Sequence, residues 1–378
     1  MIRVLVAEDS AFMRRVLSDL FKAHPDFELV DTAMNGKEAV EKTVRLKPDL
    51  VTMDVNMPIM DGLQALEIIM RDCPVPVVMF SSLTREGAEA TIKALSLGAV
   101  DFISKTGGAI SRIDTIESEI IEKCRIAAGA NVRQRSAVVP PAEKAPAEPV
   151  MRRIEWPQRK PLPQYTAPPF TPRTPPAIRT VPPAGGSGRG GKLVVLGTST
   201  GGPKALQTVI ARLPRSLPCG VLVVQHMPPG FTKSLAERLN EISEISVKEA
   251  ENHDIIEAGH VYIAPGNYHM VVERNGYSRE IVLNQDPPLG TLRPAADVLF
   301  KSAARFGPDV VSVILTGMGS DGAAGMQQIK QAGGYIIAEA ESTAVVYGMP
   351  RAVVELGIAD EVLPLPAIAN AIVSAVRK

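Results

Sequence analysis

A proline- and glycine-rich segment divides the chain, and a single hydrophobic core cannot extend across it. Residues 140–183 contain 14 of the 32 prolines, and residues 185–191 add a run of glycines. Such a segment has too few apolar side chains to offset the entropy lost on ordering. We therefore predict a flexible, partly polyproline linker over 129–191 between two domains, 1–128 and 192–378. The lone Trp156 within it is either an incidental linker residue or a docking motif.

Before the linker, short β-rich runs alternate with helical segments. The predicted strands are 2–7, 28–33, 49–54, 75–80 and 99–103, and the predicted helices are 11–23, 36–46, 62–70 and 87–97. This alternation predicts an α/β domain in which five parallel strands are covered by helices on both faces. Ligands of such sheets bind at the carboxyl ends of the strands.

The same alternation resumes after the linker. The predicted strands are 192–197, 220–225, 260–264, 310–315 and 335–338, and the predicted helices are 203–211, 231–241, 295–305, 322–331 and 368–376. A hairpin-like region over 268–283 interrupts the pattern. We predict a larger α/β domain, doubly wound and mostly parallel.

The bulk composition excludes several classes of protein. Lys plus Arg and Asp plus Glu are both 41, so the net charge is zero and no electrostatic argument favours nucleic acid or an acidic membrane. The three cysteines have no metal-ligand spacing and are predicted to be small buried hydrophobes in a reducing cytosol. The apolar run before Glu8 is too short for a signal peptide or a membrane span. We expect a soluble, cytoplasmic protein that reaches membranes only through a partner.

Acidic residues end two of the predicted N-terminal strands. Glu8 and Asp9 close the first strand and Asp54 closes the third, so three carboxylates are expected to converge at one sheet edge. Their mutual repulsion favours a bound cation, and hard oxygen ligands suit Mg²⁺. Ser81 ends the fourth strand and Lys105 follows the fifth, which together would surround a phosphoryl group on Asp54. The alternative, that the acids are only helix N-caps, does not explain Ser81 and Lys105.

This part of the chain resembles the receiver domain of response regulators over about 125 residues. The resemblance rests on Glu8–Asp9, Met53–Pro58, Asp61–Gly62, Ser81 and Lys105. It implies a flavodoxin-like fold and phosphorylation of Asp54 by a histidine kinase.

The resemblance also implies a ligand set and a switch. Mg²⁺ would be held by Asp9, Asp54 and the carbonyl of Asn56, with Glu8 acting partly through water. Phe102 matches the aromatic switch position and acts with Ser81 and Lys105. Receivers usually have proline after the lysine, and the local turn is often built on a cis-proline. Thr106 occupies that position here, so the resemblance does not predict the conformation of this turn.

Three residues of catalytic type follow three strands of the C-terminal half. Ser199 lies in Gly197–Gly202, which has the G-x-S-x-G pattern of a nucleophile elbow, and Pro203 suits the first helical position. The same loop is a weak candidate for phosphate binding, because it lacks G-x-G-x-x-G spacing. His226 ends the next apolar strand, and Asp321 lies in a glycine-rich turn that opens a helix. Taken alone, His226 could be a structural histidine and Asp321 a helix N-cap. Taken together with Ser199, the three residues predict a catalytic triad.

These segments resemble the catalytic domain of the chemotaxis methylesterase family, also called CheB-type, over about residues 192–376. The resemblance rests on residues 197–202, 225–232 and 315–323. It implies Ser199 as nucleophile, His226 as general base and acid, and Asp321 as the residue that orients it. Met318 matches an oxyanion-binding backbone N–H, and Thr200 lies beside the nucleophile. It implies no cofactor in this domain.

The expected substrates are glutamyl methyl esters on the cytoplasmic helices of chemoreceptors, and possibly receptor glutamines. The expected phosphodonor is the chemotaxis histidine kinase, and the expected location is the cytoplasm, with recruitment to membrane chemoreceptor arrays. Two alternatives remain at this stage. One is a response regulator whose output domain only binds, and the other is a nucleotide-dependent α/β enzyme. A DNA-binding output would need a basic recognition helix, and none stands out.

Overall fold

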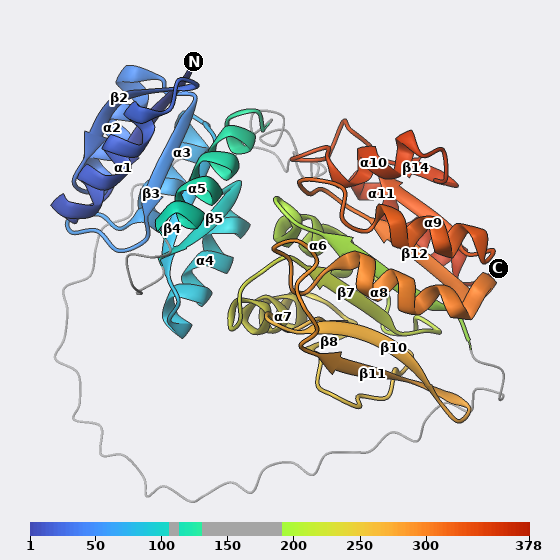
Figure 1. The fold of residues 1–378 in the computed structure, drawn as a ribbon. Helices are drawn as coiled ribbons and strands as arrows, with labels where there is room; N and C mark the ends of the chain where they lie inside the picture. Colours follow the sequence, from blue (N-terminus) through green and yellow to red (C-terminus); the bar gives the residue numbers. More distant parts are fainter. Residues whose placement is uncertain (106–112, 131–190) are drawn as a thin grey trace, which may run out of the picture. The chain divides into compact units, whose positions relative to one another are not determined.

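The computed structural model describes residues 1–105, 113–130 and 191–378. Thr106, Trp156 and nearly all of the predicted linker therefore lie outside the described residues. The described residues all belong to one compact unit. Figure 1 shows the α/β layering of its N-terminal and C-terminal parts.

The N-terminal part is a five-stranded parallel sheet with the strand order β2-β1-β3-β4-β5. Its elements are β1 (Ile2–Ala7), α1 (Ala11–Ala23), β2 (Phe27–Ala33), α2 (Gly36–Leu46), β3 (Leu50–Asp54), α3 (Gly62–Asp72), β4 (Val77–Ser82), α4 (Arg85–Leu97), β5 (Asp101–Lys105) and α5 (Ile113–Ala128). Successive side chains of β1 point to opposite faces of the sheet, so this strand contributes to two cores. Val4 and Val6 pack with α1 and α5, whereas Leu5 and Ala7 share a core with α2, α3 and α4.

The C-terminal part has seven parallel strands in the order β14-β13-β12-β6-β7-β9-β8, and a separate antiparallel hairpin, β10-β11. The strands are β6 (Leu193–Thr198), β7 (Val221–Gln225), β8 (Ser246–Glu249), β9 (His260–Ile263), β10 (His269–Asn275), β11 (Ser278–Asn284), β12 (Val310–Ile314), β13 (Tyr335–Glu339) and β14 (Glu361–Leu363). The helices are α6 (Gly202–Ile210), α7 (Phe231–Ile242), α8 (Ala296–Ala303), η3 (Ala304–Asp309), α9 (Ala323–Gln331), α10 (Met349–Glu355) and α11 (Leu365–Ala375).

The strand order places a topological switch point at β6. The chain leaves β6 for β7 on one side and returns much later to β12 on the other. In open α/β sheets the crevice at such a point, at the carboxyl ends of the strands, is where ligands bind. The loops after β6, β7 and β12 are therefore neighbours, and these are the loops that carry the predicted catalytic residues.

The predicted α/β class and both sheets are confirmed, with differences at some elements. The helix α5, the short strands β8 and β14 and the helix α10 are absent from the predicted set. The fourth strand begins at Val77 rather than at residue 75, and Pro76, which has no N–H to donate, immediately precedes it. Cys124 and Cys219 are buried as predicted, but Cys73 is only half-buried. Burial raises the pKa of the Cys219 thiol to about 12, which keeps it protonated. Among the described residues no helix is long and apolar enough to cross a membrane.

Candidate functional sites

Ser199 lies in a tight turn between β6 and α6. Gly201 adopts a left-handed conformation with φ of 78°, which an L side chain rarely takes. The turn is fixed from the opposite loop, because the Ser199 N–H donates to the Thr316 carbonyl at 3.0 Å. Pro203 lies in the first turn of α6 as its second residue, one position later than predicted. The turn is the strand-to-helix elbow that the sequence pattern predicted.

His226 and Asp321 form a hydrogen-bonded pair. The distance from His226 Nε2 to Asp321 Oδ2 is 2.7 Å, and the two side chains are 9% and 5% exposed. Asp321 also accepts the N–H groups of Ala296 at 2.6 Å and Asp297 at 3.0 Å, at the start of α8. Burial alone would raise the pKa of Asp321, but the hydrogen bond and charge of His226 and these two N–H groups lower it overall. The carboxylate is thus held ionised against the imidazole.

The pairing assigns the two nitrogens of the imidazole. Because Nε2 faces Asp321, Nδ1 is the nitrogen left to take a proton from Ser199. The described residues contain no hydrogen bond between the Ser199 hydroxyl and His226. Such contacts are often long in free enzymes and tighten when substrate binds.

The backbone N–H groups of Thr200 and Met318, near Ser199, have no hydrogen-bond partner within the described part of the chain. The N–H of Ser199 itself is committed to Thr316. Both unpaired donors belong to turns at the carboxyl edge of the sheet, one after β6 and one after β12. They are the two residues that the sequence indicated near the oxyanion.

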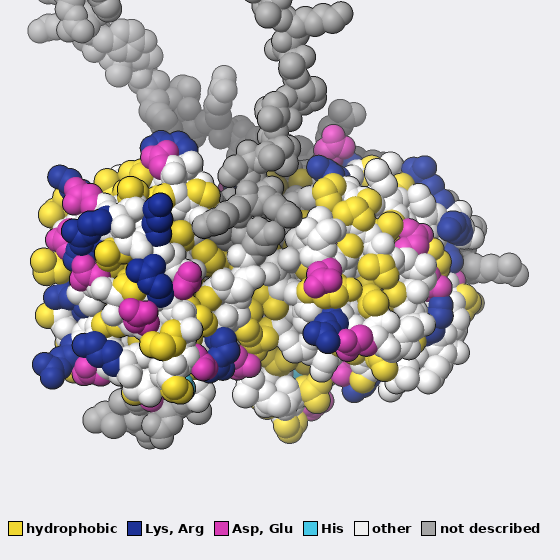
Figure 2. Space-filling view, turned by 90° about the horizontal axis from the view of Figure 1, so that it is seen from above, with side chains coloured by type: hydrophobic (Ala, Val, Ile, Leu, Met, Phe, Trp, Pro, Cys, Tyr) yellow, Lys and Arg dark blue, Asp and Glu magenta, His cyan; other side chains and the backbone are white. Residues whose placement is uncertain are grey.

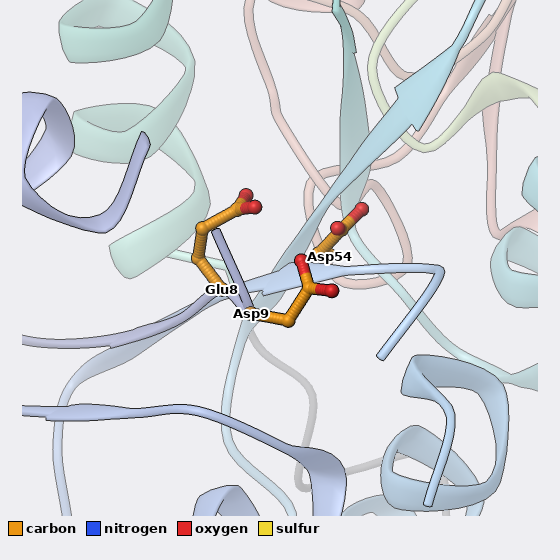
Figure 3. Close-up of side chains that lie close together, drawn as sticks. All are labelled: Glu8, Asp9 and Asp54. Carbon is orange, nitrogen blue, oxygen red and sulfur yellow. The ribbon is translucent and has the colours of Figure 1, made fainter. Parts of the chain in front are cut away.

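The three predicted carboxylates of the N-terminal part converge. One carboxylate oxygen of each of Glu8, Asp9 and Asp54 lies within 4.8 Å of the others, and Figure 3 shows the Asp9 and Asp54 carboxylates beside one another. Lys105 Nζ lies 2.8 Å from both Glu8 Oε2 and Asp54 Oδ2. Asn56 follows two residues after β3 and is exposed. An oxygen-rich cluster of this kind fits Mg²⁺.

Burial and charge shift the pKa values in this cluster. Burial raises the pKa of Glu8, and the nearby Asp54 adds to the rise, although Lys105 opposes it. Burial alone would lower the pKa of Lys105, but its hydrogen bonds to Asp54 and Glu8 raise it overall. The ammonium therefore stays charged beside the predicted phosphorylation site.

The two other predicted switch residues make contacts of different kinds. The Ser81 hydroxyl is buried and donates to the Gly87 carbonyl at 2.9 Å, rather than to a carboxylate of the acidic cluster. The Phe102 ring is buried and stacks on the Phe231 ring of α7, with centroids 4.8 Å apart and an interplanar angle of 13°.

Sequence reasoning missed a buried polar layer beneath the candidate triad. The Thr316 hydroxyl donates to the Thr200 carbonyl at 2.9 Å and accepts the Val346 N–H at 3.0 Å. The Thr316 N–H donates at 2.8 Å to Glu339, a carboxylate with 0% exposure. Gln225 donates to the carbonyls of Ser199 and His226. The only sequence signal was polar residues ending apolar strands.

Comparison with known proteins identifies a family for each part of the chain. Residues 4–116 match the response regulator receiver domain, and residues 194–372 match the CheB methylesterase family. The chain is thus of the class in which a response-regulator receiver precedes a methylesterase domain.

Curated relatives extend this match to the whole chain. It is 51% identical to a protein-glutamate methylesterase/protein-glutamine glutaminase of Symbiobacterium thermophilum, over 99% of this chain and 97% of the relative. It is 45% identical to one of Geobacillus kaustophilus, over 98% of each chain. The chain belongs to the protein-glutamate methylesterase/protein-glutamine glutaminase family. It is also similar to the crystal structure of the Thermotoga maritima CheB methylesterase catalytic domain, with 45% identity and a TM-score of 0.48 over 49% of this chain and 98% of that one.

Proposed function

We propose that this protein is a phosphorylation-regulated serine hydrolase that demethylates glutamyl methyl esters on chemoreceptor helices during chemotaxis adaptation. The observation that carries the proposal is the His226–Asp321 pair, 2.7 Å apart, at the sheet edge that also carries Ser199. The names of the full-length relatives support the substrate class. Glutamine deamidation would use the same groups, with ammonia rather than methanol as the product.

The proposed reaction is acyl transfer through a Ser199 ester. His226 takes the hydroxyl proton as Ser199 Oγ bonds to the ester carbon, and the carbonyl oxygen becomes an oxyanion. The N–H groups of Thr200 and Met318 are the donors proposed to stabilise that oxyanion. The tetrahedral intermediate then expels methoxide, which His226 protonates to methanol. Water, deprotonated by His226, attacks the ester and releases glutamate and Ser199.

The direct test is methanol release from methylated receptor. A serine-directed inhibitor and Ser199→Ala should each abolish release by the folded protein. Full release by a folded Ser199→Ala protein would contradict the triad and favour an alternative active site. A wild-type protein that binds receptor without releasing methanol or ammonia would instead favour a binding-only output domain.

The receiver part is proposed to control this activity through a phosphoryl group on Asp54. Asp9, Asp54 and the Asn56 carbonyl would hold Mg²⁺, with Glu8 acting partly through water, and the ion would neutralise phosphoryl oxygens. Lys105, already 2.8 Å from Asp54, is placed to pair with another of those oxygens. Ser81 would exchange its bond to Gly87 for one to the phosphoryl group. The chemotaxis histidine kinase is the proposed phosphodonor.

Contacts between the receiver part and the methylesterase part support inhibition in the unphosphorylated state. The Thr200 hydroxyl donates at 2.6 Å to Asp101, the first residue of β5, and Phe102 stacks on Phe231. The first contact joins the residue before Phe102 to the residue after Ser199, and the second involves Phe102 itself. A shift of Phe102 toward the phosphorylated site would break the stack and weaken this interface. Coupling of this kind is typically about 1–3 kcal/mol, or roughly 5- to 150-fold.

Three preparations test the regulation on methylated receptor. They are the full chain, the full chain with acetyl phosphate and Mg²⁺, and a fragment beginning near Gly190. We expect the fragment to exceed the resting full chain, and acetyl phosphate to activate only proteins that retain Asp54. Equal activity of fragment and resting protein would contradict inhibition and favour receptor targeting as the role of the receiver.

The surface is consistent with protein partners rather than nucleic acid. Figure 2 shows basic and acidic side chains interspersed over the face that it draws, in keeping with the zero net charge. A membrane-array location would therefore come through the chemoreceptors. A cosedimentation assay with receptor-containing and receptor-free vesicles distinguishes binding to chemoreceptors from binding to lipid. Equal binding to both kinds of vesicle would contradict the proposal.

A further inference from the structure

The peptide that joins Ser199 to Thr200 is held by its carbonyl. The Ser199 oxygen accepts two hydrogen bonds, from Gln225 Nε2 at 3.0 Å and from the Gly202 N–H at 2.8 Å. A trans peptide is planar, and its N–H points opposite to its C=O. The groups that fix the Ser199 carbonyl therefore also fix the direction of the Thr200 N–H, which has no hydrogen-bond partner among the described residues.

Gln225 is built into this position. It is 2% exposed and ends β7, and its Nε2 also donates at 3.1 Å to the carbonyl of His226. The opposite amide orientation would place its oxygen against two carbonyl oxygens, so the donor assignment is fixed by its neighbours. Its Oε1 is buried and has no hydrogen-bond partner among the described residues. One amide thus links the nucleophile turn to the histidine turn.

The Gln225 side chain packs closely against the start of α6. A Cβ on Gly202 would lie 2.0 Å from Gln225 Oε1 and 2.5 Å from Thr198 Oγ1, so position 202 requires glycine. The second proposed oxyanion donor is held in a comparable way. The Gly317 carbonyl, in the same peptide as the Met318 N–H, accepts the N–H groups of Gly348 at 3.1 Å and Met349 at 2.9 Å.

We infer that Gln225 is a positioning residue that aims the Thr200 N–H at the developing oxyanion. The inference rests on the proposed hydrolase function, because it concerns the oxyanion of that reaction. It differs from a binding role in one measurable respect. An oxyanion donor acts mainly in the transition state, so its loss lowers kcat while leaving KM nearly unchanged.

The test uses the full chain with Gln225→Met and Gln225→Glu. Methionine keeps the approximate volume and removes the donor, whereas glutamate keeps the shape and replaces the donor by an oxygen. Loss of one oxyanion donor costs about 10²–10³ in kcat, and a misaimed donor should cost roughly 10–10². Ser312→Ala is the matched control, since it removes a buried side-chain hydrogen bond to the Tyr335 carbonyl in the same sheet without touching the site.

A second readout is the affinity for butylboronic acid. Its boron bonds to Ser199 Oγ, whose proton passes to His226, and the resulting tetrahedral adduct mimics the intermediate. The affinity of the Gln225 variants should fall in parallel with kcat, while Ser312→Ala retains wild-type values. Folded Gln225 variants with kcat within threefold of wild type, or with a raised KM and unchanged kcat, would overturn the inference.

Two further measurements separate the possible failures. If wild-type protein releases no methanol, or if Ser199→Ala retains activity, the proposed function fails before Gln225 is considered. If neither Gln225 variant folds, the amide NMR spectrum of the wild-type protein tests the inference instead. Butylboronic acid should shift the Thr200 amide proton downfield, and an unshifted Thr200 amide in the formed adduct would overturn the inference.

Discussion

Asp321→Asn is the substitution that tests the candidate triad most sharply, because the structure gives the carboxylate three donors. His226 Nε2 and the Ala296 N–H both donate to Oδ2, and the Asp297 N–H donates to Oδ1. An asparagine has only one oxygen, so its NH₂ group must face at least one of these donors. The two amide orientations have different consequences for the imidazole.

If NH₂ takes the place of Oδ2, it opposes the Ala296 N–H and turns His226 Nε2 into an acceptor. The proton then lies on Nδ1, which cannot accept the Ser199 proton, and the precedent for the wrong tautomer is a loss of roughly 10⁴. If NH₂ takes the place of Oδ1, it opposes only the Asp297 N–H, and His226 keeps its bond to a neutral oxygen. A hydrogen bond to a charged group contributes about 1.5–3 kcal/mol, so losing its charge-assisted part costs at most about 10–10² in kcat.

The second orientation has one opposed donor rather than two, so we expect the smaller loss. Methanol release from methylated receptor measures it, with thermal unfolding recorded on the same samples. Asp297→Asn is the control, because Asp297 is also buried and accepts a backbone N–H, from Gly325 at 2.7 Å, without contacting His226. Unchanged turnover in Asp321→Asn, beside an inactive His226→Ala, would show that Asp321 only caps α8.

Four other outcomes are expected. Ser199→Ala should lower kcat by roughly 10⁶ with the unfolding temperature unchanged, and turnover close to the wild-type rate would contradict Ser199 as the nucleophile. Thr316→Val should lower stability by about 2–4 kcal/mol in urea unfolding, since two buried groups lose their partner, whereas Thr316→Ser should retain most of it. Asp54→Asn should abolish stimulation by acetyl phosphate but keep basal methanol release, and stimulation that persists would place the phosphate elsewhere. The pKa of Asp321 is lowered in the folded protein, so its ionised form stabilises the fold at pH values above the ordinary aspartate pKa. This stabilisation is lost as the pH falls through the folded pKa. The stability difference between wild type and Asp321→Asn should therefore shrink at acid pH.

The fold was largely predictable because apolar periodicity records which face of each element is buried. Strands β1 and β6 contain the apolar runs Val4–Ala7 and Leu193–Leu196, which is what a parallel sheet covered on both faces requires. The missed strands, β8 and β14, have four and three residues, too few to show a period. Helix α5 (Ile113–Ala128) also lies outside the predicted helices, the last of which in this part of the chain ends at residue 97.

The candidate site was predictable only as far as residue chemistry and strand ends allow. Ser199, His226 and Asp321 have side chains with recognisable roles, and each follows an apolar strand. Gln225 and Thr316 act through the carbonyls and N–H groups of turns distant in sequence. Which turns meet is fixed by the strand order β13-β12-β6-β7, and no local pattern records that order.

The sheet order also accounts for the unusual chain order of the candidate triad. The nucleophile elbow follows β6, which is flanked by β7 and β12. The chain continues from β6 directly to β7, so His226, which follows β7, comes second in the sequence. Asp321 comes third because it follows β12, to which the chain returns later. Ordinary α/β-hydrolases have the order serine, acid, histidine. Serine, histidine, aspartate is therefore a consequence of topology here, and the chemistry requires only that three strand ends meet at one edge.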